Sequence, residues 1–203
     1  MKISIVLLDL GGVLIELAGI KRMIELMREK VTPEEFLTRW LYSEYVRLYE
    51  SGQCSTETFA EGIVKELDMD ITPGDFLEEF PLYAKGFLPG AVELLQELKQ
   101  KYTLACLSNT NIIQWNGLCE RISLDKYFHH NFLSFEMGKL KPERDIYIHV
   151  IEKLGCAPEE IVFFDDNEDN VKAAVDAGMN AYRVLGCADL KEKLETLNII
   201  GAI

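Results

Sequence analysis

Four polar elements follow short apolar runs in this chain, and each carries a side chain able to act as a nucleophile, a cation or a hydrogen-bond donor. In chain order they are Asp9, Ser108-Asn109, Lys141 and Asp165-Asp166. Taken singly, each has an ordinary structural role, since an Asp after a strand commonly caps a helix. In open parallel sheets, however, ligands bind at the carboxyl ends of the strands. We therefore expect the four elements to meet in one site.

Together these residue types suit an attack by a carboxylate on a phosphate ester. A carboxylate such as Asp9 and a phosphate dianion repel each other by roughly several kcal/mol at contact distance in a partly screened site. Attack therefore needs cations, which Mg²⁺ held by Asp9 and Asp166 and the fixed charge of Lys141 can supply. The Ser108 hydroxyl and nearby backbone N–H groups are natural donors to phosphate oxygens.

The elements that must position these side chains alternate along the chain. Short β-rich apolar runs of the kind buried in parallel sheets occur at residues 3–8, 103–107, 132–134, 161–164 and, more weakly, 181–184. Between them lie stretches with helical apolar spacing at residues 91–101, 112–122, 143–154 and 171–177. Strands alternating with helices predict an α/β fold, a Rossmann-like parallel sheet with helices on both faces.

One stretch interrupts this alternation. Residues 20–82 contain no convincing strand, and helix start signals recur there, such as Thr32-Pro33 followed by two glutamates. Further starts are expected at Ser55 and Thr72. The pattern predicts a core of residues 1–17 and 87–203, and an all-helical cap of residues 18–86 over the carboxyl ends of the strands.

Composition excludes several classes of protein. The chain has 203 residues and a formal net charge of −13, so it offers no electrostatic footprint for nucleic acid or an anionic membrane. Its five cysteines form no Cys-x-x-Cys pair, which argues against a disulfide framework and a structural zinc site. The apolar N-terminal run is broken by Asp9 and is too short for a signal sequence. We expect a cytoplasmic protein whose partner is a small molecule; the oligomeric state stays open.

With these motifs in this order, the chain resembles the haloacid dehalogenase-like (HAD) hydrolases, and among them phosphatases with a helical cap after the first strand. It is similar to the subgroup of sugar-phosphate phosphatases around α-D-glucose-1-phosphate phosphatase. The likeness lies in the segments at residues 107–111, 141–143, 163–170 and, in the cap, 49–52. The resemblance implies a Mg²⁺-dependent phosphoric monoester hydrolase that acts on a small phosphorylated metabolite, with a sugar phosphate as the expected substrate.

The resemblance also implies a role for each matched residue. Asp9 would be the nucleophile, forming an aspartyl-phosphate, and a Mg²⁺ ligand. Ser108 and the Asn109 backbone would bind the phosphoryl group, and Lys141 would neutralise it together with Asp9. The remaining roles fall to Asp166 and the Gly11 carbonyl as metal ligands, and to Asp165 and Asn170 as supporting residues.

The chain departs from the family pattern at Gly11. Most family phosphatases carry a second Asp two residues after the nucleophile, where it protonates the leaving group and then activates water. Such a group contributes on the order of 10²–10⁴ in rate. Members similar to glucose-1-phosphate phosphatase also carry Gly there, so the departure does not imply inactivity. Glu16 and Glu50 are candidate replacements by proximity in sequence alone.

Two other functions stay open. A haloacid dehalogenase shares the Asp, Ser and Lys but uses no metal, and the pair Asp165-Asp166 argues against it. A non-catalytic protein that binds a phosphorylated metabolite is supported only by Gly11. Activity with and without Mg²⁺ on a panel of phosphate esters separates the three possibilities.

Overall fold

A five-stranded parallel sheet forms the centre of the computed structural model, which describes residues 2–201. Its strands, in the spatial order β5-β4-β1-β6-β7, confirm the predicted α/β fold class. Their bounds are β1 Ile5–Leu8, β4 Thr103–Ser108, β5 His130–Leu133, β6 Ile161–Asp165 and β7 Asn180–Arg183. β1, β4 and β6 are almost wholly buried, which is why they consist of near-continuous apolar runs.

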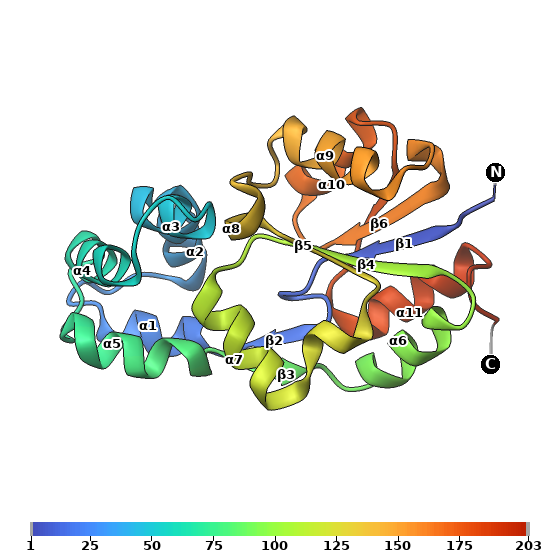
Figure 1. Cartoon of the computed structure of the whole chain (residues 1–203). Helices are drawn as coiled ribbons and strands as arrows, with labels where there is room; N and C mark the ends of the chain where they lie inside the picture. Colours follow the sequence, from blue (N-terminus) through green and yellow to red (C-terminus); the bar gives the residue numbers. More distant parts are fainter. Residues whose placement is uncertain (1, 202–203) are drawn as a thin grey trace.

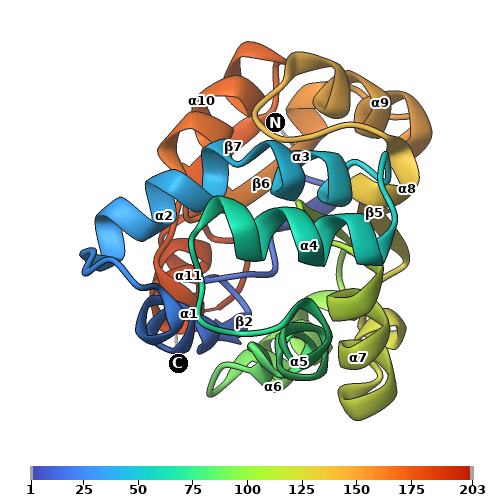
Figure 2. The same cartoon turned by 90° about the vertical axis from the view of Figure 1, so that its left-hand side faces the viewer.

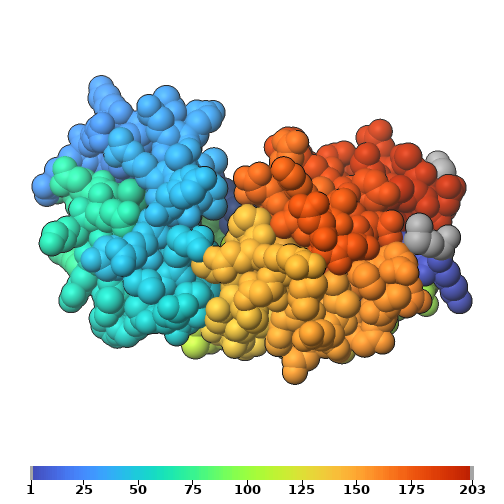
Figure 3. Space-filling model, turned by 90° about the horizontal axis from the view of Figure 1, so that it is seen from above, coloured from blue at the N-terminus to red at the C-terminus, as the bar shows by residue number. Residues whose placement is uncertain are grey.

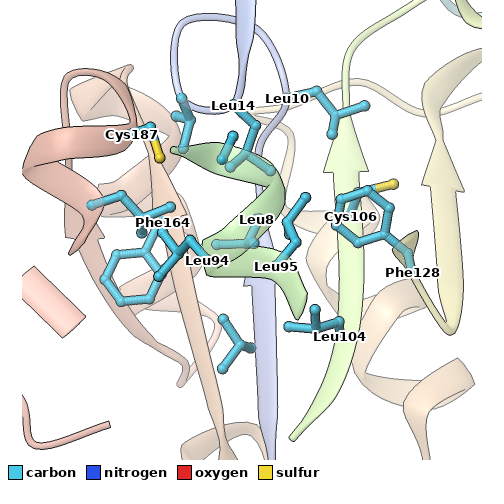
Figure 4. Packing of buried hydrophobic residues seen from close by; sticks show 14 of the residues in the cluster. Leu8, Leu10, Leu14, Leu94, Leu95, Leu104, Cys106, Phe128, Phe164 and Cys187 are labelled. Atoms are coloured by element: carbon cyan, nitrogen blue, oxygen red, sulfur yellow. The ribbon is translucent and has the colours of Figure 1, made fainter. Parts of the chain in front are cut away.

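Helices cover both faces of the sheet (Figure 1). On one face, α6 (Ala91–Lys99), α7 (Ile112–Ile122) and α11 (Gly186–Thr196) contribute to one apolar cluster with the sheet. Figure 4 shows part of it, with Leu94 and Leu95 of α6 close to Leu8 and Phe164. On the other face, α9 (Arg144–Leu154) and α10 (Glu168–Asp176) form a second cluster. Alternate residues of β1 pack in the two clusters, since successive side chains of a strand point to opposite faces.

Some predicted bounds differ from the structure. β5 ends at Leu133, and Ser134 begins the short helix α8 (Ser134–Met137) instead of ending the strand. The Ser134 hydroxyl bonds to both the amide and the carbonyl of Thr110, at 2.9 and 3.0 Å. α11 is absent from the predicted elements, although Cys187, Leu190 and Leu194 recur at the spacing of one helix face.

The insert is helical, as predicted, and forms a cap. It contains α1 (Gly19–Leu26), α2 (Pro33–Tyr42), α3 (Glu44–Glu50), α4 (Thr56–Glu66) and α5 (Pro73–Glu79), with a 3₁₀ turn at Phe80–Leu82. The predicted start at Thr32 is a capping box with Glu35, and Ser55 and Thr72 cap α4 and α5. The cap has an apolar core of its own, in which the Tyr49 ring stacks on Phe59 with centroids 4.3 Å apart.

A two-stranded antiparallel ribbon joins the cap to the core. It consists of β2 (Ile15–Leu17) and β3 (Ala84–Phe87), and the sequence predicts neither strand. The segment that enters the cap thus pairs with the segment that leaves it. Backbone hydrogen bonds extend this pairing at both ends, from the Ala18 amide to the Tyr83 carbonyl and from the Leu88 amide to the Leu14 carbonyl. The predicted division after residue 86 passes through β3.

The cap and the core form two lobes that meet along a seam, visible in the space-filling view (Figure 3), and Figure 2 shows the ribbon from the cap side. At the seam, α3 packs against α8, and Arg47 of α3 pairs with Glu143 of the core at 2.7 Å. Within residues 2–201, every helix is too short or too polar to cross a membrane.

Candidate active site

Strand register brings Asp9 beside Asp165. β1 pairs with β6 so that Leu8 lies beside Phe164, and the next residue along each chain is an aspartate. The Asp9 amide donates to the Phe164 carbonyl at 2.9 Å, which continues the pairing past the end of β1. On the other side of β1, β4 ends at Ser108. Three neighbouring strands therefore deliver these polar residues to one edge of the sheet.

The Lys141 ammonium group lies between two carboxylates. Its Nζ is 2.9 Å from Asp9 Oδ1 and 2.6 Å from Asp165 Oδ2, and its side chain is 2% exposed. A charge so far from water persists only when it is paired. Burial alone would lower the pKa of Lys141, but the two carboxylates outweigh it and raise that pKa above its usual value. Lys141 is therefore a permanent cation in contact with Asp9.

Asp165 is fully occupied by protein donors. Its Oδ1 accepts hydrogen bonds from the Asn167 amide at 2.8 Å and from Asn170 Nδ2 at 2.9 Å, and its Oδ2 faces Lys141. The Tyr147 hydroxyl donates to the Asn170 carbonyl at 3.0 Å, which joins this group to α9. Asp165 thus orients the ammonium group, and Asn170 orients Asp165.

The Asn109 side chain holds the loop that carries Lys141. Its Nδ2 donates to the Lys141 carbonyl at 3.0 Å, and its Oδ1 accepts from the Lys141 amide at 2.9 Å. The sequence predicts a role only for the Asn109 backbone, as a hydrogen-bond donor to the phosphoryl group, and does not predict this clamp. The two residues are distant in sequence, so no local pattern could have indicated the contact.

Ser108 lies next to Asn109 with its hydroxyl nearly free. The residue is 4% exposed, and its Oγ makes one long contact, 3.5 Å from the Asn109 carbonyl. A hydroxyl with such a weak partner keeps its hydrogen-bonding capacity for a ligand. Its place at the end of β4, beside the end of β1, fits the predicted contact with a phosphoryl oxygen near Asp9.

Three carboxylates gather where the sequence predicts a metal. One oxygen each of Asp9, Asp165 and Asp166 lie within 4.8 Å of one another. Because Asp165 is already occupied, Asp9 and Asp166 are left to ligate a cation. Mg²⁺ commonly binds through one or two carboxylates, with water and substrate oxygens as its other ligands. The donor set therefore fits Mg²⁺, and Gly11 lies between β1 and β2, close enough in sequence to Asp9 for its carbonyl to join.

The charge balance of the cluster also favours a cation. Burial, together with the charges of Asp165 and Asp166, raises the pKa of Asp9 to about 7, although Lys141 acts in the opposite direction. Burial and the charge of Asp165 likewise raise the pKa of Asp166. Three carboxylates face one ammonium group, and a divalent cation would offset the excess negative charge.

Gly12 makes room for Asp166. Its φ is +71°, and a Cβ atom there would lie 2.5 Å from Asp166 Oδ2. Any other residue would therefore be strained and would push the carboxylate away. The sequence signal for this position is the Gly11-Gly12 pair directly after Asp9, whose second glycine has no predicted role.

Comparison with known proteins gives a family and several named relatives, among them the following two. The family model of the haloacid dehalogenase-like hydrolases matches residues 3–178. Flavin mononucleotide hydrolase 1 of Arabidopsis thaliana is 29% identical over 154 residues, which are 74% of this chain and 61% of that protein. D-ribitol-5-phosphate phosphatase of Bacteroides thetaiotaomicron is 22% identical over 206 residues, covering 95% of this chain and 97% of that protein. The chain thus spans less than two thirds of the plant protein.

A solved structure of a similar protein contains magnesium. A HAD family enzyme from Bacteroides thetaiotaomicron, in complex with magnesium and inorganic phosphate, superposes with a TM-score of 0.74 at 28% identity. The alignment covers 90% of this chain and 94% of that one. That complex and the carboxylate cluster here both agree with the predicted cofactor, Mg²⁺. The match over most of its length, with a helical cap over this site, shows that the chain belongs to the haloacid dehalogenase-like hydrolases.

Proposed function

We propose that this hydrolase is a Mg²⁺-dependent phosphatase that cleaves a small phosphate monoester through an aspartyl-phosphate on Asp9. The observation that carries the proposal is the buried Lys141 in contact with Asp9, beside the carboxylate of Asp166. This arrangement pairs a nucleophile with the cations that an anionic phosphate requires. The magnesium and phosphate complex of the solved relative supports it.

The residues divide the reaction among them. Asp9 attacks the phosphorus, so a bond forms between its carboxylate oxygen and phosphorus while the bond to the leaving oxygen breaks. Lys141 and the Ser108 hydroxyl hold the phosphoryl oxygens, and Asp165 with Asn109 keeps Lys141 in place. Mg²⁺, held by Asp9, Asp166 and the Gly11 carbonyl, would neutralise the charge of the phosphoryl group. Water then releases inorganic phosphate from Asp9.

We expect chelation by EDTA to remove the activity and added Mg²⁺ to restore it. Asp166→Ala removes the carboxylate that Asp9 and Asp165 cannot replace, so half-saturation should need roughly tenfold to a hundredfold more Mg²⁺. Phosphate release measured against Mg²⁺ concentration gives both results. Asp169→Ala, an exposed position in the first turn of α10, is the matched control. Full phosphate release in EDTA would contradict the proposed role of Mg²⁺.

The proposed substrate is a phosphate ester of a sugar or polyol chain. The two named relatives hydrolyse flavin mononucleotide and D-ribitol-5-phosphate, according to their names. Both compounds are phosphate monoesters of a polyol chain. Similarity to α-D-glucose-1-phosphate phosphatase and a cytoplasmic location stay predictions. A panel of sugar, polyol, nucleotide and cofactor phosphates, each with and without Mg²⁺, tests the substrate class.

The cap, which we propose to be the unit at residues 18–86, would select the substrate. At the seam, residues of α2, α3 and the following loop face Gly138, Leu140 and Glu143 of the core across a hollow of about 410 Å³. Leu140 and Glu143 lie on either side of Lys141 in the sequence, in the loop that carries it, although Lys141 itself does not line the hollow. A larger hollow of about 690 Å³ lies wholly within the cap and contains no site residue.

Tyr42 lines the hollow at the seam and is 80% exposed. We expect Tyr42→Ala to change the kcat/KM ratio between two sugar phosphates by roughly tenfold, with little change for a small aryl phosphate. Leu37→Ala, also exposed on α2, is the control. Tyr45 is not a suitable trial, because its ring packs on Gly62 of α4 inside the cap. A proportional loss on all substrates would exclude Tyr42 as a specificity residue.

A further inference from the structure

The proposed reaction needs a proton donor that the core does not supply. At Gly11 there is no side chain, and Lys141 is a cation held between two carboxylates, so it cannot donate without leaving them unpaired. In-line displacement places the leaving oxygen on the side of the phosphorus opposite the attacking Asp9. The cap lies over that end of the strands, so an acid on the cap side of the site would face the leaving oxygen.

The end of α3 is fixed against the core near the site. Arg47, one turn before the end of the helix, pairs with Glu143 at 2.7 Å, two residues from Lys141. Two residues after the end of the helix, Gly52 has a φ of +68°, and a Cβ there would collide with the Phe135 carbonyl of α8. Figures 1 and 2 both place α3 beside α8. The last turn of α3 therefore has a defined position over the core.

Glu50 is the last residue of α3 and lies three positions after Arg47, on the same side of the helix. Val46 and Tyr49, by contrast, are buried in the apolar core of the cap. Glu50 is half-buried, and among the contacts of residues 2–201 it takes part in no side-chain hydrogen bond or ion pair, while its carboxyl oxygens still reach solvent. It is therefore free to bind a ligand.

Glu50 lies within the electrostatic influence of Lys141, a residue of the site. Burial raises its pKa to about 7, while the charges of Lys141 and Arg47 act in the opposite direction. An acid with a pKa near neutrality can both give and take a proton at physiological pH. Glu16, the other candidate, is exposed and lies 3.8 Å from Lys85 on the ribbon that joins the lobes. The structure thus favours Glu50 over Glu16 as the candidate acid, a choice that the sequence left open.

We propose that Glu50 is the general acid and base of the reaction, in place of the side chain absent at Gly11. The inference rests on the phosphatase function proposed above. As the bond between phosphorus and the leaving oxygen breaks, the Glu50 carboxyl gives its proton to that oxygen, and the alcohol departs. In the second step the Glu50 carboxylate takes a proton from water as the water oxygen bonds to phosphorus. The Asp9–phosphorus bond breaks, and inorganic phosphate leaves.

Glu50→Gln tests this assignment because it keeps the size of the side chain and removes its acid. On an alkyl phosphate, whose leaving oxygen needs a proton, we expect kcat to fall by about 10²–10⁴-fold. On 4-nitrophenyl phosphate, whose leaving group departs without a proton, the first step should proceed at the wild-type rate. Release of phosphate from Asp9 should then be slow. Rapid mixing should show a burst of nitrophenolate stoichiometric with enzyme, with phosphoenzyme trapped on acid quench.

Two controls make the outcomes decisive. Glu16→Gln should retain wild-type kinetics on both substrates, and Glu50→Asp, which retains a carboxyl group, should recover part of the rate. A Glu50→Gln enzyme that loses activity on both substrates without a burst, or keeps its kcat on the alkyl phosphate, overturns the assignment. If the wild-type enzyme cleaves no phosphate ester with Mg²⁺ present, the proposed function itself fails, which is a different result.

Discussion

Asp9→Asn is expected to abolish turnover, by about 10³-fold or more, while the protein stays folded. An amide is a far weaker nucleophile than a carboxylate, and it cannot form the acyl-phosphate. The exchange preserves size, and Lys141 keeps its contact with Asp165 at 2.6 Å, so the buried ammonium group is not left alone. Phosphate release on the best substrate of the panel and the thermal unfolding midpoint measure the two effects.

A covalent intermediate gives this prediction a second measurement. Wild-type enzyme quenched in acid during turnover should carry one phosphoryl group on the peptide that contains Asp9, and the Asp9→Asn enzyme should carry none. Asp176→Asn, an exposed position at the end of α10, serves as the control for the amide exchange. Activity above a few per cent of wild type in purified Asp9→Asn enzyme would contradict the covalent mechanism.

Much of the core site could be predicted because its signals are local. A buried strand is a short apolar run, and the polar residue that ends it lies next to it in sequence, as Asp9 follows Leu8. Parallel pairing then brings such strand ends together at one edge. For this reason the meeting of Asp9, Ser108 and Asp165 follows from spacing and fold class, whereas the place of Lys141, in the loop after α8, is implied by the family resemblance.

The contacts that the sequence does not predict are non-local. The Asn109 clamp on Lys141 joins two loops, and the β2–β3 ribbon pairs segments on either side of the whole cap. β2 and β3 are only partly buried, so they lack the continuous apolar run that reveals β1. The sequence could not distinguish Glu16 from Glu50 as candidate acids. They differ in where the ribbon and α3 place them relative to the site, and only packing determines that.

Lys141→Met is expected to destabilise the fold and to abolish activity. Methionine matches the length of the lysine stem but removes the charge, so Asp9 and Asp165 lose their common partner in a site closed to water. Breaking a buried pair in this way costs about 3–5 kcal/mol. Denaturant unfolding in EDTA measures that loss. Lys139→Met, which breaks the more exposed pair of Lys139 with Asp145, should cost at most about 1 kcal/mol.

The double variant Lys141→Met/Asp165→Asn separates the structural from the chemical role of the lysine. Removing a charge from each side leaves fewer carboxylates unpaired, so most of the lost stability should return. Catalysis should not return, because no fixed cation then faces the phosphate beside Asp9. A double variant as unstable as Lys141→Met would show that the unpaired carboxylates are not the cause of the loss. Recovery of activity together with stability would remove Lys141 from the proposed mechanism.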